Sequence, residues 1–306
     1  MYRSGNILDE IRDSFRRGST LTKLIYVNLG VFLVLKILYV IFFLFSSGQF
    51  SLVQKSAIFQ AKYLVYLMVP SNLNELLIKP WTPLTYMFLH FGFLHILFNL
   101  IILFWFGRIF LHYLNEKQLL TTYLLGGLAG AAMFILAYNI FPGLSDGVAL
   151  GASASVMAVV ISISFYNPNY EVLIPFIGST KLKYIALFYV VLDVLQIASD
   201  NSGGHLAHLG GALYGYLFAV QLKRGKDTGK GFSKFIDGLV TLLKPKPKLK
   251  VTYKNQAKSM TDFDYNKEKA ATQKEVDKIL DKIAQSGYDS LTKKEKEILF
   301  KLGGKS

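Results

Sequence analysis

The chain has 306 residues, of which 52% are hydrophobic, and a formal net charge of +14. Its mean hydropathy of +0.36 and its long apolar runs, separated by short polar segments, favour a polytopic membrane protein over two soluble domains. The absence of cysteine excludes disulfides, thiolate chemistry and cysteine-ligated metal sites.

The first apolar run follows a polar lead that contains several arginines. This run, from Leu24 to Phe45, is longer than the apolar region of a secretory signal peptide, so we expect it to be retained as a membrane span. With about 20 residues per span, the apolar runs predict an all-α bundle of six transmembrane helices. These helices are expected at 22–45, 83–106, 118–140, 150–166, 184–199 and 205–222. Residues 1–21 would then form a cytoplasmic N-terminal segment, and residues 22–222 one six-span domain.

The distribution of Lys and Arg indicates which side of the membrane each loop faces. These residues are dense before the first span and after the last, and others follow the second and fourth spans, at Arg108, Lys117, Lys181 and Lys183. The opposite connections, 139–150 and 200–204, contain neither residue. We therefore expect a multi-pass protein of the cell (cytoplasmic or inner) membrane with both termini in the cytoplasm. The second, fourth and sixth spans then all begin on the outer side.

The region after the last predicted span is strongly basic. From Lys223 to Ser306 it contains 21 Lys and Arg against 11 Asp and Glu, a net +10 of the chain's +14. Lys and Arg beside a membrane gain about 1 kcal/mol each near anionic lipid. Because no nucleic-acid-binding motif accompanies this charge, we expect anionic lipid, and no nucleic acid, as its partner.

Two parts are expected within this basic region. Residues 223–271 are predicted to form a basic linker that includes an interfacial amphipathic helix at 232–243. Residues 272–303 are predicted to form a small helical hairpin, because two Thr-x-x-Glu segments match the spacing of capping boxes. These segments are Thr272 with Glu275 and Thr292 with Glu295.

Few ionisable or strongly hydrogen-bonding side chains fall within the predicted spans, where they are costly and therefore candidate site residues. They are His90, His95 and Asn99 in the second span, Ser153 and Ser155 in the fourth, Asp193 in the fifth, and His205 and His208 in the sixth. On the predicted topology, those of the second, fourth and sixth spans all fall in the outer halves of three helices that run in the same direction. The sequence therefore predicts that these groups converge at one depth.

These residue types fit acyl transfer by a serine nucleophile. A serine needs a neighbouring base, and the developing oxyanion needs hydrogen-bond donors. Ser153 begins a predicted helix, so free backbone N–H groups and the positive end of the helix dipole lie beside it. His208 is the available base, while His95 and Asn99, four residues apart on one helical face, can both donate.

Small residues predict that the fourth and sixth spans approach closely. They recur at Ala207, Gly211 and Gly215 in the sixth span, and as Gly151 with Ser155 or Ala154 with Ala158 in the fourth. Such patterns are common alone, but here they accompany a serine and a histidine at the same depth.

Three segments of the chain resemble the rhomboid intramembrane serine proteases. They are HFGFLHILFN from His90 to Asn99, GASAS within residues 151–155, and AHLGGALYG from Ala207 to Gly215. The resemblance covers roughly residues 20–222, with the motifs in the right order and on the right helices. It implies a six-span serine endopeptidase without a cofactor, which hydrolyses peptide bonds in or near the transmembrane segments of membrane proteins.

Carried over to this chain, the resemblance implies a role for each matching residue. Ser153 would be the nucleophile and His208 the general base and then acid, while His95, Asn99 and the Ser153 backbone N–H would stabilise the oxyanion. Gly151 would shape the approach to the nucleophile, and Gly211 would allow the sixth span to close on the fourth. The chain departs from the family pattern at Thr82, Leu111 and Met157. Met157 stands where an aromatic side chain commonly packs on the catalytic histidine, so another neighbour would have to orient His208.

Other interpretations apply to the remaining polar residues. Ser155 lies about 200° around the helix from Ser153 and is expected to bond to a carbonyl or face a neighbouring helix. His205 could compete with His208 as the base but is expected at the membrane entrance, and His90 is expected to support the site structurally. We expect no metal, because the histidines lack an acidic ligand pair or an HExxH motif. Asp193 could orient His208 or serve helix packing.

Two other functions remain open from the sequence. A catalytically silent rhomboid-like protein would bind membrane-protein clients without cutting them. A transporter or channel would need a polar path to both faces, whereas the inner halves of the predicted spans carry almost no charge.

Overall fold

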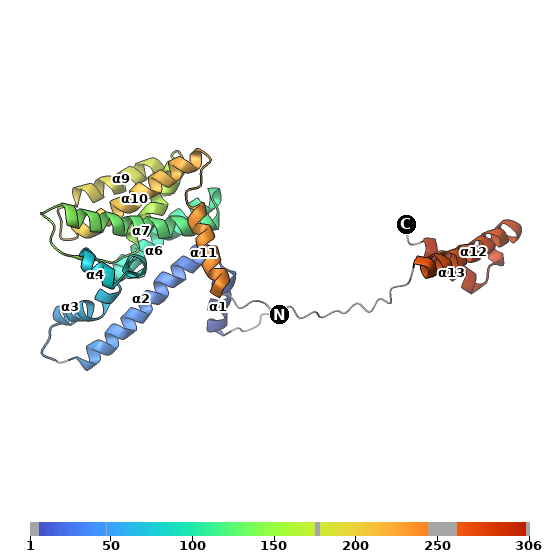
Figure 1. The fold of residues 1–306 in the computed structure, drawn as a ribbon, viewed down its shortest axis with the longest axis horizontal. Helices are drawn as coiled ribbons and strands as arrows, with labels where there is room; N and C mark the ends of the chain where they lie inside the picture. The colour runs from blue at the N-terminus through green and yellow to red at the C-terminus, as the bar shows by residue number, and fades with distance from the viewer. Residues whose placement is uncertain (1–5, 47, 175–177, 244–261, 304–306) are drawn as a thin grey trace. The chain divides into compact units, whose positions relative to one another are not determined.

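The computed structural model describes residues 6–46, 48–174, 178–243 and 262–303. The chain divides into two compact units, Met1–Lys244 and Pro245–Ser306 (Figure 1). Part of the linker expected at 223–271, namely residues 244–261, lies outside the described residues, as do residues 1–5 of the expected N-terminal segment.

The first unit is a helical bundle with two short antiparallel strand pairings. Its elements are α1 (Ile7–Arg17), α2 (Thr20–Phe45), α3 (Leu52–Lys62), η1 (Leu64–Tyr66), β1 (Val69–Pro70), α4 (Leu73–Ile78), α5 (Thr82–Thr85), η2 (Tyr86–Phe88), α6 (Phe93–Tyr113), α7 (Glu116–Ile140), β2 (Val148–Ala149), α8 (Ser153–Tyr166), β3 (Glu171–Ile174), β4 (Gly178–Lys181), α9 (Leu182–Leu195), α10 (Ser202–Lys223) and α11 (Lys230–Leu243). β1 pairs antiparallel with β2, and β3 with β4.

The predicted all-α membrane bundle is confirmed. Within the described ranges, six helices correspond to the six predicted spans: α2, α6, α7, α8, α9 and α10. Of these, α2, α6 and α7 are long and apolar enough to cross a membrane, and α8 is a shorter apolar helix. Figure 1 shows α7, α9 and α10 grouped together, whereas α2 extends away from them.

The predicted start of the second span is wrong. The helix α6 begins at Phe93 rather than near residue 83, because the preceding segment is divided into the single turns α5 and η2. Leu89 then adopts an extended conformation, with ψ of 134°, and Gly92 is the N-cap of α6. Hydropathy is continuous through this stretch and therefore did not reveal the break.

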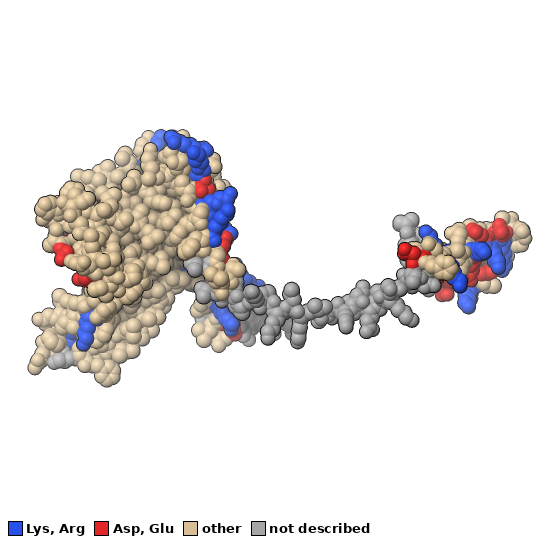
Figure 2. All heavy atoms as spheres, in the orientation of Figure 1, with Lys and Arg blue, Asp and Glu red and all other residues tan. Residues whose placement is uncertain are grey.

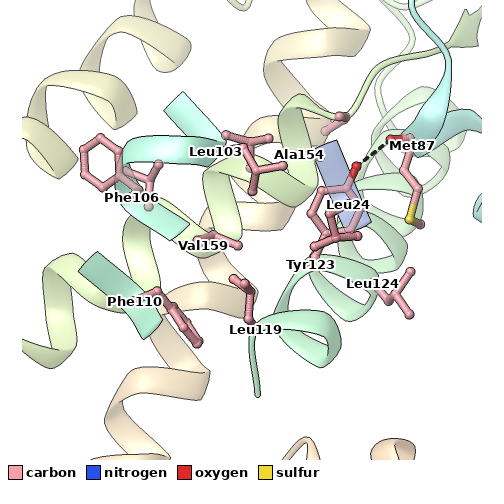
Figure 3. Close-up of a cluster of buried hydrophobic side chains, with 14 of the residues drawn as sticks. Leu24, Met87, Leu103, Phe106, Phe110, Leu119, Tyr123, Leu124, Ala154 and Val159 are labelled. Atoms are coloured by element: carbon pink, nitrogen blue, oxygen red, sulfur yellow. Dashed lines mark hydrogen bonds between the residues drawn. The ribbon is translucent and has the colours of Figure 1, made fainter. Parts of the chain in front are cut away.

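The short helix α8 lies at the centre of the bundle, with every residue from Ala154 to Ser164 buried. Figure 3 shows Leu103, Phe106 and Phe110 of α6 near Val159 of α8, with Leu119, Tyr123 and Leu124 contributed by α7. The Tyr123 hydroxyl donates to the Met87 carbonyl over 3.1 Å and accepts a bond from the Asn28 amide over 3.0 Å. This buried polar link joins α7, η2 and α2.

Small residues allow two helices to approach the backbone of α8. A Cβ added at Gly211 of α10 would lie 2.1 Å from the Ala154 carbonyl oxygen, and one at Gly215 would lie 2.5 Å from that of Ala158. On the α7 side, a Cβ added at Gly126 would lie 2.2 Å from Ala158 Cβ. Of the two small-residue pairs predicted in the fourth span, α10 therefore uses Ala154 with Ala158.

The second unit contains α12 (Asp262–Ser286), η3 (Tyr288–Ser290) and α13 (Lys293–Gly303). The capping box predicted at Thr272 is wrong, because Thr272 lies inside α12 and its hydroxyl donates to the Glu268 carbonyl over 2.9 Å. The second capping box is confirmed, since Glu295 N–H donates to the Thr292 hydroxyl and Thr292 N–H donates to the Glu295 carboxylate. Lys282 of α12 also bonds this carboxylate, over 3.0 Å.

Candidate active site

A cavity of about 680 Å³ lies among α6, α8, α9 and α10. Four of the side chains that the sequence singled out line it: His95, Asn99, Ser153 and His208. Met157 and Asp193 line the same cavity. The convergence predicted for the second, fourth and sixth spans is therefore present in the structure, and a helix of the fifth span adds a carboxylate.

The backbone before α8 is held in place by hydrogen bonds to other segments. β2 pairs with β1, Gly151 N–H donates to the Tyr86 carbonyl over 2.9 Å, and Ala152 N–H donates to His90 Nε2 over 3.5 Å. With 14 residues, α8 spans only about 21 Å, less than the roughly 30 Å thickness of a bilayer's hydrocarbon core. Irregular backbone at such a depth requires internal partners, and these bonds supply them. Ser153 is the first residue of α8.

Gly151 allows Ser153 and His95 to lie next to each other. Its φ of +133° is a conformation that side chains with a Cβ rarely adopt. A Cβ added there would lie 3.1 Å from His95 Nε2 and 3.4 Å from Ser153 Oγ. The hydroxyl and the imidazole thus border the same small space, which only a glycine leaves open.

Asn99 lies one turn after His95 on α6 and is largely buried. Its amide nitrogen donates to the His95 carbonyl over 2.8 Å. An amide NH₂ group carries two hydrogens, so the second remains for a group within the cavity. Together with the Ser153 backbone N–H, the donors expected for an oxyanion surround one region.

His208 is hydrogen-bonded to a carboxylate that sequence analysis left with two interpretations. Asp193 Oδ1 lies 2.8 Å from His208 Nδ1 and also 2.8 Å from His205 Nδ1. Asp193 is 6% exposed, so the carboxylate is almost completely removed from solvent. The fifth and sixth spans are thereby joined beside the cavity. Ser153 and His208 are not hydrogen-bonded to each other in the described structure, which is common before a substrate binds.

The same three side chains offer ligand atoms that could hold a metal ion. The Asp193 oxygen and the His205 and His208 nitrogens lie within 4.8 Å of one another. Both Nδ1 atoms already bond to Asp193 Oδ1, whereas Asp193 Oδ2 is buried and has no hydrogen-bond partner among the described residues. The expectation that the site uses no metal stays a prediction.

The other polar residues lie away from the cavity. Ser155 is buried against α7, where a Cβ added at Gly127 would lie 2.5 Å from its hydroxyl oxygen. His90 is also buried, with its ring centroid 5.0 Å from that of His95. Ser155 thus faces a neighbouring helix, and His90 contacts the backbone before Ser153; a supporting role for His90 stays a prediction.

Sequence reasoning missed several residues that line the cavity: Tyr189, Gln196 and Asn201. Tyr189 lies within α9, whereas the other two lie in and beside the connection from α9 to α10. The polarity of Gln196 and Asn201, close after Asp193, was the available signal.

Comparison with known proteins identifies the family. Residues 78–225 match the Rhomboid domain, a range that runs from the end of α4 into the residues just after α10 and includes every candidate site residue. The chain contains a rhomboid domain. α2 lies outside the matched range of this rhomboid domain, and residues 261–305 match a separate family of unknown function, DUF6576.

The chain is also similar to a curated protein, "RHOMBOID-like protein 12, mitochondrial", of Arabidopsis thaliana. The two are 27% identical over an alignment of 160 residues, and the match covers 47% of each chain. The chain therefore spans about half the length of this relative.

Proposed function

We propose that this rhomboid-family membrane protein is a serine endopeptidase that hydrolyses peptide bonds in or near the transmembrane segments of other membrane proteins. The observation that carries the proposal is the meeting of Ser153, His208, His95 and Asn99 around one cavity at the N-terminus of α8. A nucleophile, a base and oxyanion donors are the groups that acyl transfer requires.

The proposed reaction uses the groups of this chain alone. His208 Nε2 takes the proton of the Ser153 hydroxyl while Oγ bonds to the carbonyl carbon, whose oxygen becomes an oxyanion. Donors from His95, Asn99 and the Ser153 backbone stabilise that charge. The C–N bond then breaks as His208 returns its proton to the leaving amine, and an ester to Ser153 remains. His208 then takes a proton from water while the water oxygen bonds to the ester carbon. The bond from that carbon to Ser153 Oγ breaks, the carboxylic acid leaves, and His208 returns the proton to Oγ.

The walls of the cavity support sideways entry of the substrate from lipid. Leu94 and Phe98 of α6 line one side and Tyr189 and Leu192 of α9 line another. We propose that a substrate segment enters between α6 and α9, the second and fifth spans. Because a helix has no free carbonyls in its interior, the segment must unwind locally, so cleavage near small or helix-breaking residues is expected.

The distribution of charge supports the proposed orientation. Figure 2 shows Lys and Arg gathered along one end of the first unit, next to a broad surface with few charges. α11, at the start of the basic region, lies at this end, where Lys117 Nζ is 2.6 Å from Asp237 Oδ2. We propose that this end faces the cytoplasm and anionic lipid, with both termini on that side of a cell membrane. A reporter fused after Ser306 that is active only outside the cell would contradict this orientation.

Cleavage of a panel of single-span reporters in liposomes tests the proposed activity. Wild type is compared with Ser153→Ala, His208→Ala and Ser155→Ala, the last being the matched control on the same helix. Loss with the first two and retention with the third is expected. If no reporter is cut and a serine-reactive phosphonate does not label Ser153, the chain is instead a client-binding protein that does not cut.

A further inference from the structure

The buried carboxylate of Asp193 has an unusual set of partners. It lies near the end of α9, 6% exposed, and one oxygen accepts hydrogen bonds from two histidines of α10. A buried carboxylate is costly unless it is paired, and here Oδ1 carries both bonds while Oδ2 has no hydrogen-bond partner among the described residues. Its partners, His205 and His208, stand three residues apart, with ring centroids separated by 5.8 Å.

The bond to His208 determines which nitrogen of that ring is free. A carboxylate only accepts, so Nδ1 at 2.8 Å from Asp193 Oδ1 is the nitrogen that carries the proton. Nε2 then has a lone pair available as a base. This is the nitrogen that the proposed reaction uses to accept the Ser153 proton.

We propose that Asp193 is a positioning residue for His208: its Oδ1 holds the imidazole in the Nδ1–H tautomer, with Nε2 as the base toward Ser153. The inference rests on the proposed protease function and goes beyond the two-residue serine–histidine pair implied by family resemblance. The carboxylate of Asp193 also stabilises the imidazolium that forms when Nε2 takes the proton.

The neighbouring wall of the cavity explains why such a residue is needed here. Met157 lines the cavity one turn after Ser153 and packs with Ile161, Ala186 and Ala212. A flexible thioether has no flat face on which an imidazole could stack. The orientation of His208 is therefore assigned to its hydrogen bond with Asp193 rather than to stacking on residue 157, and the His205 ring meets the His208 ring at its edge.

The competing interpretation is that Asp193 only anchors α9 to α10. His205 provides a control for this, because it bonds to the same oxygen over the same distance of 2.8 Å but is absent from the lining of the cavity. Loss of either partner would weaken an anchor, whereas only the bond to His208 affects the tautomer of the base.

The test measures kcat and KM for a single-span reporter with the full chain in liposomes. Asp193→Asn keeps the shape of the side chain but removes its charge. In a Ser-His-Asp triad this change costs about 10⁴-fold in kcat. Because the Asp193 oxygen is shared with His205, we expect a smaller loss here, of about 10- to 100-fold in kcat, with KM changed less than about twofold. His205→Ala should stay within about threefold of wild type.

A double variant separates positioning from anchoring. Asp193→Asn in the His208→Ala background should not slow phosphonate labelling of Ser153 further, because a residue that acts through His208 has no effect once His208 is gone. An equal slowing in both backgrounds would overturn the proposal. So would a loss of kcat with His205→Ala as large as with Asp193→Asn, or an activity that a chelator abolishes, since the cluster would then hold a metal.

Two further controls keep the outcomes distinct. If Ser153→Ala still cuts, the proposed protease mechanism fails; if Ser153→Ala is inactive but Asp193→Asn is fully active, only the role of Asp193 fails. Should Asp193→Asn not fold, ¹⁵N-histidine NMR of Ser153→Ala protein, assigned with His208→Ala, reads the tautomer directly. A proton on Nδ1 of His208 is expected, and one on Nε2 in the neutral ring would overturn the inference.

Discussion

The Cα of Gly211 lies against the carbonyl oxygen of Ala154, the residue after Ser153, so that an added Cβ would come within 2.1 Å of that oxygen. This contact sets the separation of α10 and α8 beside the cavity, with His208 on one helix and Ser153 on the other. Neither backbone can yield as a flexible side chain would, because both belong to helices whose hydrogen bonds fix them.

Gly211→Ala should therefore force α10 away from α8 and reduce both stability and cleavage. Overpacking of this kind costs about 1–3 kcal/mol, and the displacement also separates His208 from Ser153. Thermal unfolding and reporter cleavage measure the two effects. Gly30→Ala in α2 is the control, since a Cβ at Gly30 meets nothing within 4 Å. Equal unfolding temperatures and equal cleavage rates in the two variants would show that the contact of Gly211 with Ala154 does not limit how closely α10 and α8 approach.

Gly151→Ala should abolish cleavage more completely than it destabilises the fold. The left-handed φ of +133° costs about 1–2 kcal/mol for alanine, and the new Cβ would press on the His95 ring at 3.0 Å. Gly225→Ala controls for the strain alone, because Gly225 has φ of +77° and open space around it. We expect the kcat of Gly225→Ala to equal that of wild type. The kcat of Gly151→Ala should fall at least about tenfold, because a catalytic group is then misplaced. Comparable activity in the two variants would argue against a role for this space.

The main features of the site could be predicted because they depend on residue type and depth. Ser153 and His208 fall near the beginnings of helices that run in the same direction, so the topology alone brings them to one level. The hydrogen bonds from His205 and His208 to Asp193 could not be predicted in the same way. They depend on the rotation of α9 about its axis, which hydropathy leaves open when a helix is apolar on most sides.

The errors in the predicted helix bounds have a similar origin. Hydropathy does not register a break within an apolar run, so the extended Leu89 and the N-cap Gly92 were absorbed into one span. The Thr-x-x-Glu pattern also occurs inside helices, where the threonine bonds to the carbonyl four residues earlier, as Thr272 does. At Thr292 a non-helical residue, Leu291 with ψ of 137°, precedes the same pattern, and there the capping box forms.

The pKa of the Glu295 carboxyl should be far below that of an ordinary glutamate. Hydrogen bonds from the Thr292 backbone N–H and hydroxyl, and then from Lys282, lower the pKa of Glu295 to about 2. Because this folded-state pKa lies below the unfolded value of about 4.3, ionised Glu295 stabilises the hairpin above that pH. The contribution is lost as pH falls from about 4 to about 2. A ¹³C-glutamate NMR titration of the full chain measures the pKa.

Two threonine variants make that titration specific. Thr292→Ala removes the hydroxyl donor and should raise the pKa of Glu295 toward its ordinary value. Thr272→Ala removes a hydroxyl that bonds only to the Glu268 carbonyl, and should leave the titration of Glu295 unchanged. A pKa of Glu295 near 4 in the wild type would mean that the capping box is not formed in solution.

The point of truncation in the basic region should decide whether the bundle remains stable. Gln118 Nε2 donates to Asp227 over 3.0 Å, and Phe232 of α11 packs against the core of the first unit. Ending the chain after Leu243 leaves these contacts intact, so we expect unfolding temperature and reporter cleavage close to those of the full chain.

Ending the chain after Lys223 removes these contacts together with the Lys117–Asp237 pair. That exposed pair contributes about 0–1 kcal/mol, and burial of an aromatic side chain about 1.5–3 kcal/mol, so a lower unfolding temperature is expected. A loss of cleavage after the first truncation, with an unchanged unfolding temperature, would instead assign the second unit a direct part in substrate handling.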